Sequence, residues 1–266
     1  MRGLLLAAAL AALPAAAQER FITLSSTTST EQSGLFGELL PKFRAASGIA
    51  VRVVAVGTGQ ALRLGERGDA DVVLVHDEAS ELAFVAAGFG IERKPAMYND
   101  FVLVGPTPVG SPRDAVASFR DLAGRPFVSR GDDSGTHKAE LRLWQAAGID
   151  PKSGTGRWYR ETGSGMGATL NMAAALDAYT LADRASWASF GNRRGLTIAS
   201  AGDPKLFNPY GVMLVNPVRH PHVKAAEGRA FIAWLTGAEG RAAIAAFRVG
   251  GQQIFFPLPA APAPRS

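Results

Sequence analysis

The sequence predicts an α/β protein with a mainly parallel sheet, and two observations carry this prediction. β-prone apolar runs alternate with segments of helical spacing along the chain. The run 72–75 is continuously apolar, which is typical of a parallel strand covered by helices on both faces. The 266 residues, of which 47% are hydrophobic, suffice for one large domain or two modest ones.

The N-terminus has the layout of a secretory signal peptide. Arg2 supplies a basic start, an apolar run rich in Leu and Ala follows over 3–13, and Pro14 precedes the small residues 15–17. The run is too short to span a bilayer as a mature helix. We therefore predict that residues 1–17 are a signal peptide, that cleavage follows Ala17, and that the mature protein is periplasmic.

The first half of the mature chain is expected to alternate strands and helices. Residues 35–43 carry apolar side chains at helical spacing and are followed by Ser47-Gly48, which ends a helix. At Gly57-Thr58-Gly59 a β-prone run ends and the next helix begins. Strands are predicted over 21–25, 49–56, 71–75 and 101–104, and helices over 35–43, through 61–62 and over 80–87.

The second half continues the alternation. Helices are predicted over 116–122, 136–147, 168–176, 222–235 and 238–247, and strands over 126–129, 180–183 and 210–215. The segment 180–189 is interpreted as a strand that leads into a helix. The Pro-rich tail from Pro257 is expected to lack regular structure.

Two strands end in proline motifs that suggest crossovers between lobes. The strand 101–104 stops at Gly105-Pro106 and the strand 210–215 at Asn216-Pro217. A first lobe would then comprise 18–104 and 216–266, and a second lobe would comprise 105–215. One continuous sheet with two ordinary strands fits the pattern equally well.

Composition excludes several kinds of site. The chain has no cysteine, so a disulfide framework, a thiol nucleophile and an Fe–S cluster are ruled out. The net charge of +5 is not concentrated in any basic run, so we expect no nucleic-acid partner. His76-Asp77-Glu78 is interpreted as a solvated strand end rather than as metal ligands. We expect no metal and no cofactor.

Four loops share one local plan, in which small hydroxyl or glycine residues open a helix. They lie at 24–29, 56–59, 128–136 and 163–167. Helix N-termini leave free N–H groups and carry partial positive charge, so each loop is a candidate anion site. The same residue types also serve as ordinary helix caps. Because loops at the carboxyl ends of strands meet in one crevice in α/β sheets, four of them favour a shared site.

Arg130 adds a positively charged guanidinium group, with paired N–H donors, to the third loop. It can hold an oxyanion bidentately, or pair with Asp132 or Asp133. The same loop contains Asp132, Ser134 and His137, the residue types of a hydrolytic triad. Neighbours in one turn do not easily form a line of attack, so a serine hydrolase is the weaker hypothesis.

Seven stretches, in order along nearly the whole mature chain, resemble the TupA-like family, the periplasmic tungstate-binding proteins of ABC importers. They are Ser26-Thr27-Thr28-Ser29-Thr30 with Ser33-Gly34-Leu35, and the segments 56–62, 68–76, 98–106, 129–137, 161–170 and 208–212. Ser26 stands where the family often has Thr, which keeps the hydroxyl.

The resemblance implies a two-lobed type II periplasmic-binding-protein fold with two hinge crossover strands and an oxyanion between the lobes. It also implies that the protein is not an enzyme. The implied ligand contacts are Thr28, Ser29 and Thr58 from one lobe and Arg130, Ser134, Gly135 and Thr136 from the other, with Ser33, Gly165 and Met166 as further candidates.

The implied partners are tungstate or molybdate and the membrane permease of an ABC importer, with the protein a monomer. Phosphate is the alternative ligand, because 130–136 is also similar to a motif of phosphate-binding proteins. Hydrogen phosphate carries a proton that a carboxylate accepts, whereas tungstate and molybdate only accept hydrogen bonds. A site lined only by donors would therefore favour the metal oxyanion, and the direction of Asp132 is expected to matter.

Overall fold

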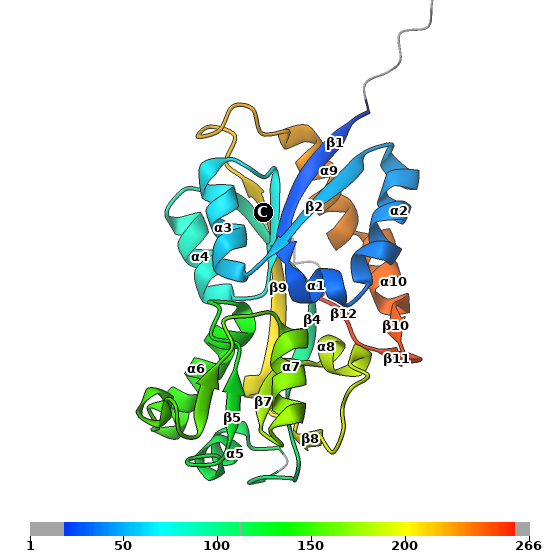
Figure 1. Ribbon diagram of the computed structural model, residues 1–266. Coiled ribbons are helices and arrows are strands. Elements are labelled where there is room, and N and C mark those ends of the chain that lie inside the picture. Colours follow the sequence, from blue (N-terminus) through cyan, green and yellow to red (C-terminus); the bar gives the residue numbers. More distant parts are fainter. Residues whose placement is uncertain (1–18, 112, 259–266) are drawn as a thin grey trace, which may run out of the picture.

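The computed structural model describes residues 19–111 and 113–258. The predicted signal peptide and its cleavage site lie outside the described residues. Within these ranges the chain forms two lobes, one above the other in Figure 1, joined by the long strands β4 and β9.

The first lobe is built on a sheet in the order β12-β4-β9-β3-β1-β2. β1 pairs in parallel with β2 and β3, whereas β9 runs antiparallel to β3 and to β4. The strands are β1 (Phe21–Thr27), β2 (Ala50–Val56), β3 (Val72–Val75), β4 (Gly90–Gly105), β9 (Phe207–Val215) and β12 (Phe256–Pro257). The helices are α1 (Thr28–Gln32), α2 (Leu35–Ser47), α3 (Thr58–Arg67), α4 (Glu78–Ala86), α9 (Ala225–Thr236) and α10 (Ala238–Ala246). A small hairpin joins β10 (Arg248–Val249) to β11 (Gln252–Gln253).

The second lobe uses the far end of β4, which pairs antiparallel with β7 and β8. β5 and β6 form a short parallel pair beside them. The strands are β5 (Phe127–Ser129), β6 (Tyr159–Glu161), β7 (Thr180–Asp183) and β8 (Thr197–Ser200). The helices are α5 (Ala115–Asp121), α6 (Gly135–Ala147), α7 (Met166–Ala175) and α8 (Arg184–Ser189), with 3-10 turns η1 (Pro151–Gly154) and η2 (Pro204–Leu206).

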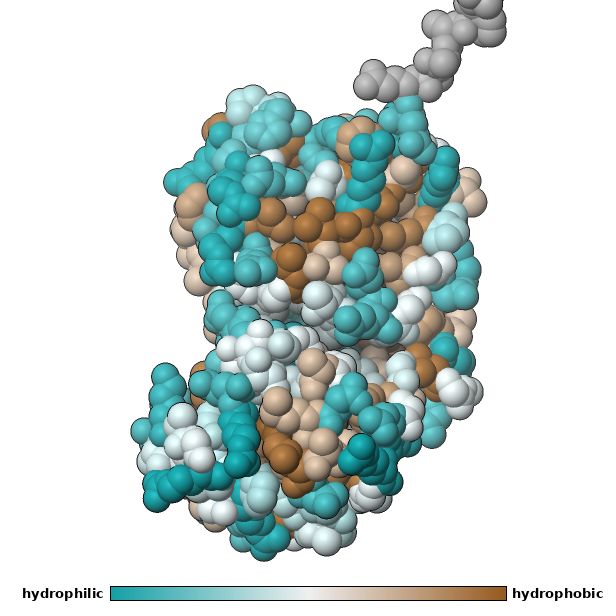
Figure 2. Space-filling view, viewed as in Figure 1, coloured by the Kyte–Doolittle hydropathy of each residue, from teal (hydrophilic) through white to brown (hydrophobic). Residues whose placement is uncertain are grey.

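The chain passes twice between the two hydrophobic cores, along β4 and again where η2 leads into β9. Along β4, Met97 packs in the core of the first lobe and Phe101 in that of the second. On the return path, Leu206 packs in the second core and Tyr210 in the first. The predicted lobe limits at 104 and 216 fall near the ends of these strands and stay a prediction. In Figure 2 the outline is indented on the left between the lobes, and the surface there is mostly pale, of intermediate hydropathy.

The predicted alternation of strands and helices is confirmed, but three details were wrong. The sheet is mixed rather than mainly parallel, because β4 and β9 run antiparallel to each other. The strand predicted over 101–104 is the end of a 16-residue strand. Pro257 is not in an irregular tail: it pairs with Met97 in β12, where a proline is tolerated at the edge of the sheet.

Candidate functional site

Loops from the two lobes meet at the start of α6. The backbone N–H of Gly135 donates to Thr58 Oγ1 over 3.1 Å, which joins the second lobe to the first turn of α3. Thr58, Ser134, Gly135 and Thr136 are all buried. Two of the predicted anion loops therefore contact each other directly.

The N-terminus of α6 is capped by a side chain and retains free hydrogen-bonding capacity. Ser134 caps the helix by accepting from the backbone N–H of His137 over 3.2 Å. Thr136 is 1% exposed, and its Oγ1 has no hydrogen-bond partner among the described residues. A buried hydroxyl without a partner costs about 1–3 kcal/mol, which an added acceptor would recover.

Arg130 is buried beside the same helix start and pairs with Asp132. Its Nη2 donates to Asp132 Oδ2 over 2.5 Å, and its Nε donates to the same oxygen over 3.2 Å. The other oxygen of Asp132 accepts from the backbone N–H of Ser134 over 3.2 Å. Of the two pairings predicted for Arg130, the structure contains the one with Asp132, whereas Asp133 is exposed and lies near Arg63 and Lys138.

The first loop brings a cluster of hydroxyl groups to the end of β1. Thr27 caps the short helix α1, and its Oγ1 lies 3.2 Å from Ser29 Oγ and 2.7 Å from Thr30 Oγ1. Ser29 is buried and Thr28 is half-buried. The Ser33 hydroxyl donates to the Thr30 carbonyl over 2.6 Å, so its only proton is used inside its own turn.

The fourth loop lies next to the third. Thr162, just before it, donates from its hydroxyl to the Arg130 carbonyl over 3.1 Å. Gly165 caps α7, and Met166 begins that helix with a buried side chain. The start of α7 therefore lies near the loop that carries Arg130.

The interpretation of His76-Asp77-Glu78 as a solvated strand end was wrong for its first two residues. His76 and Asp77 are 3% and 4% exposed, because α6 of the second lobe covers the end of β3. A Cβ on Gly135 would lie only 2.7 Å from His76 Cε1. His76 Nε2 lies 3.4 Å from Ser29 Oγ, so this residue belongs to the candidate site.

Ion pairs between α4 and α6 also join the lobes. Arg142 Nη1 donates to Asp77 Oδ1 over 2.7 Å, and Lys138 Nζ donates to Ser80 Oγ over 3.0 Å. Burial alone would raise the pKa of Asp77, but hydrogen bonds from Ser80 and Arg142 hold this pKa below its ordinary value. The lobes are thus closed on each other in this structure.

The triad residue types do not form a triad. His137 Nδ1 accepts from the backbone N–H of Asp133 over 3.2 Å, and His137 Nε2 faces Glu161 Oε1 at 3.7 Å. Ser134 Oγ is bonded to the His137 backbone rather than to its ring. This arrangement gives the serine no base.

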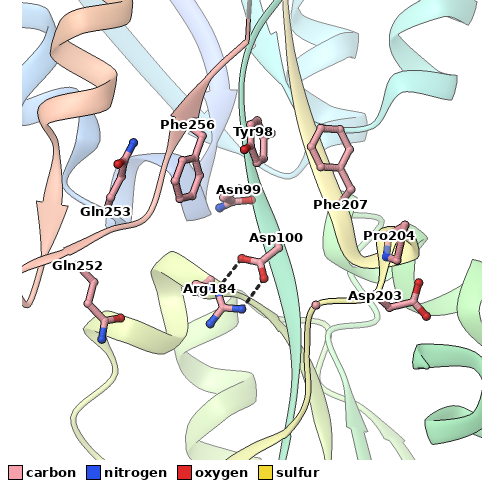
Figure 3. Close-up of a pocket in the computed structure, with 11 residues that line it drawn as sticks. Tyr98, Asn99, Asp100, Arg184, Asp203, Pro204, Phe207, Gln252, Gln253 and Phe256 are labelled. Carbon is pink, nitrogen blue, oxygen red and sulfur yellow. Dashed lines mark hydrogen bonds and ion pairs between the residues drawn. The ribbon is translucent and has the colours of Figure 1, made fainter. Parts of the chain in front are cut away.

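A cavity of about 660 Å³ lies at the hinge (Figure 3). Tyr98 of β4 stacks against Phe256 and packs against Phe207. Arg184 and Asp100 form a bidentate ion pair in its wall. None of the predicted anion-binding residues lines this cavity.

Within 19–111 and 113–258, no helix is long and apolar enough to cross a membrane. The same part of the chain holds no group of three or more His, Asp or Glu side chains placed to bind a metal ion.

Most of the chain is similar to known proteins. A family model described as a PBP superfamily domain matches residues 14–239. The "Tungstate-binding protein TupA" of Peptoclostridium acidaminophilum is 47% identical over 231 residues, which covers 84% of this chain and 80% of that protein.

Two solved structures are similar in both sequence and fold. The tungstate ABC transporter structure from Geobacter sulfurreducens shares 48% identity with a TM-score of 0.78, and the match covers 86% of this chain and 99% of that one. The tungstate-binding protein TupA from Desulfovibrio alaskensis G20 shares 40% identity with a TM-score of 0.76, over 90% and 99%. With the two-lobed topology, these matches confirm the predicted type II periplasmic-binding-protein fold.

Proposed function

The chain belongs to the TupA family of solute-binding proteins within the PBP superfamily, and on that premise we propose that it captures tungstate outside the cytoplasm for an ABC importer. The ligand is held between the lobes, and the closed complex delivers it to the membrane permease. The protein acts as a monomer and catalyses no reaction.

One observation carries the proposal: donors from both lobes converge at the start of α6. The Gly135–Thr58 hydrogen bond joins the loops, and the unpartnered Thr136 hydroxyl and the buried Arg130 lie in the same turn region. A helix N-terminus with added hydroxyl donors stabilises an anion through free N–H groups and the helix dipole. We propose that Thr28, Ser29, Thr58, Arg130, Ser134, Gly135 and Thr136 bind the oxyanion, with the backbone at Gly165 and Met166 nearby.

The chemistry of this donor set favours a fully deprotonated oxyanion. Both oxygens of Asp132 already accept hydrogen bonds from Arg130 and from the Ser134 backbone. Asp132 therefore orients the guanidinium, and three of the roughly four acceptor sites of its carboxylate are already used. Tungstate and molybdate accept hydrogen bonds only, so they match a ring of donors.

A second candidate ligand, hydrogen phosphate, is favoured by Asp183. This carboxylate is 1% exposed, and its Oδ2 has no hydrogen-bond partner among the described residues. The negative charge of Asp183 acts to raise the pKa of both His76 and Tyr210. Asp183 therefore lies near the hinge side of the site. A free carboxylate oxygen would accept the proton of hydrogen phosphate and repel tungstate.

Calorimetry with tungstate, molybdate, sulfate and phosphate tests the proposal. We expect tungstate to bind more tightly than sulfate and phosphate. Arg130→Lys keeps the positive charge but loses the planar guanidinium, which can donate two parallel hydrogen bonds. Tungstate affinity should therefore fall roughly ten- to a hundredfold. Arg130→Glu should reduce it much further, because it places a second carboxylate beside a dianion.

Arg160→Glu makes the same charge change at an exposed position of the second lobe and should bind almost normally. Equal affinities for Arg130→Lys and Arg130→Glu would reject a ligand role for Arg130. Tighter binding of phosphate than of tungstate, lost in Asp183→Asn, would favour the phosphate hypothesis.

A further inference from the structure

A continuous chain of buried side chains links the hinge strands to the first anion loop. His76 Nδ1 lies 3.0 Å from Asn208 Oδ1, and Asn208 Nδ2 donates to Asn99 Oδ1 over 2.5 Å. Asn99 Nδ2 donates in turn to the Tyr210 hydroxyl over 3.4 Å. At the other end of the chain, His76 Nε2 faces Ser29 Oγ at 3.4 Å. All five side chains are buried.

The direction of these hydrogen bonds determines which nitrogen of His76 faces Ser29 as an acceptor. The Asn208 amide nitrogen is used on Asn99, so its carbonyl oxygen faces His76, and Nδ1 must be the donor. Burial lowers the pKa of His76, so the ring is neutral at neutral pH and Nε2 carries a lone pair. Nε2 then presents an acceptor to the only proton of the Ser29 hydroxyl, and Thr27 Oγ1 at 3.2 Å is the other side-chain oxygen beside Ser29 Oγ.

A serine in this state offers an incoming oxyanion lone pairs and no proton. An acceptor-only dianion gains nothing from such a group. If His76 takes up a proton, Nε2 becomes a donor to Ser29 Oγ, and the serine hydroxyl is free to donate to the anion. The same proton adds a positive charge beside the site.

The surroundings of His76 are mixed in charge. Asp183 and Asp77 favour the protonated ring, whereas Arg130 opposes it. Tyr210, whose ring lies 4.7 Å from that of His76, and Phe101 at 6.4 Å are neutral neighbours, and Gly135 of α6 closes the remaining side. Addition of a dianion at the start of α6 shifts this balance toward protonation.

We propose that His76 is a positioning residue that couples tungstate capture to uptake of one proton, because it determines whether Ser29 accepts or donates a hydrogen bond at the oxyanion. This inference rests on the proposed function. It predicts that affinity falls as pH rises above the His76 pKa of the free protein, and that affinity is level below it. Where the free ring is neutral and the bound ring is charged, affinity changes about tenfold per pH unit.

The test measures how many protons the protein takes up when tungstate binds. Tungstate is titrated into the full mature chain between pH 7 and 8.5, in pairs of buffers that differ in ionisation enthalpy. We expect uptake of about one proton per tungstate and a matching fall in affinity with pH. His76→Gln should abolish the uptake, and Ser29→Ala should reduce it well below one.

Two control variants separate this role from other sources of protons. His137 lies in the first turn of α6, and burial lowers its pKa as well, so His137→Gln must retain the uptake. His222→Gln changes a distant histidine that bonds to the Gly68 carbonyl, and it must also retain the uptake.

Each remaining outcome has a definite meaning. Tungstate binding without proton uptake in the wild-type chain overturns the role of His76 and leaves the proposed function intact. Full uptake in Ser29→Ala shows that the field of the dianion alone protonates His76, and so overturns the coupling through Ser29. Absence of tungstate binding at every pH overturns the proposed function itself.

Discussion

Gly135 is a residue at which the two lobes approach closely in the candidate site. A Cβ there would lie 2.7 Å from His76 Cε1, 2.8 Å from His76 Nδ1 and 3.1 Å from the His76 carbonyl oxygen. The His76 ring is fixed by Asn208 and the carbonyl belongs to the backbone, so neither can yield easily. Gly135→Ala should therefore hold the lobes apart and weaken tungstate affinity by at least tenfold in calorimetry.

Gly59→Ala is the matched control for this prediction. A Cβ on Gly59 would also meet an atom of the other lobe, Asp133 Oδ2, at 2.1 Å. That carboxylate is the end of an exposed side chain and can rotate away. Affinity should thus be nearly unchanged in Gly59→Ala. Equal losses in both variants would contradict the importance of the His76 contact.

At the scale of elements, short strand–loop–helix units could be predicted from the sequence because their signals are local. Thr27, Asp77 and Ser134 cap helices where the sequence pattern changes, and Gly48 and Gly68 end helices with positive φ. The first eleven residues of β4, 90–100, could not be predicted in this way. Glu92 has a positive φ, Pro95 interrupts the run, and the register against β9 shifts twice.

The candidate site was predictable only where hydroxyl groups and Arg130 follow strands. His76 looked like a solvated residue, because the helix that buries it lies 59 residues later in the chain. The same holds for Asn99 and Asn208, whose hydrogen bond depends on the pairing of β4 with β9. Both residues lie in stretches that carry the family resemblance, 98–106 and 208–212. This resemblance was the feature of the sequence that could have pointed to them.

The contact of α4 with α6 leads to a prediction about closure. Arg142 reaches from α6 to the buried Asp77 at the start of α4, so this ion pair joins the two lobes in the closed arrangement. Arg142→Met keeps most of the apolar stem and removes the charge. The loss of one partly exposed pair, worth about 1 kcal/mol, should weaken tungstate affinity roughly fivefold.

The measurement is calorimetric affinity together with the thermal midpoint of the free protein. Arg160→Met removes an exposed arginine from the same lobe and should change neither. Wild-type affinity in Arg142→Met would mean that the ion pair does not contribute to closure.

At the scale of the whole molecule, each lobe has its own hydrophobic core, and the strands β4 and β9 connect the two lobes. We therefore expect the lobes to rotate relative to each other about these strands. This connection consists of β4, whose residues enter both cores, and of β9, which enters the first core and directly follows Leu206 of the second. The cavity behind it is lined from both sides, by Arg184 and Pro204 of the second lobe and by Gln252 and Phe256 of the first (Figure 3). Such a space allows the lobes to rotate without breaking either core.

Spin labels can measure this rotation, because the chain has no natural cysteine. Leu82 of α4 and Met172 of α7 are 52% and 40% exposed and lie in different lobes, so both accept a label. We expect tungstate to shorten and narrow the distance distribution between Leu82→Cys and Met172→Cys, since the ligand adds contacts only in the closed state. A pair within the first lobe, Leu82→Cys with the 88% exposed Val218→Cys, should show the same distance with and without tungstate. If the interlobe distance stays constant while tungstate binds, the two strands do not act as a hinge, and the lobes must be closed before the ligand arrives.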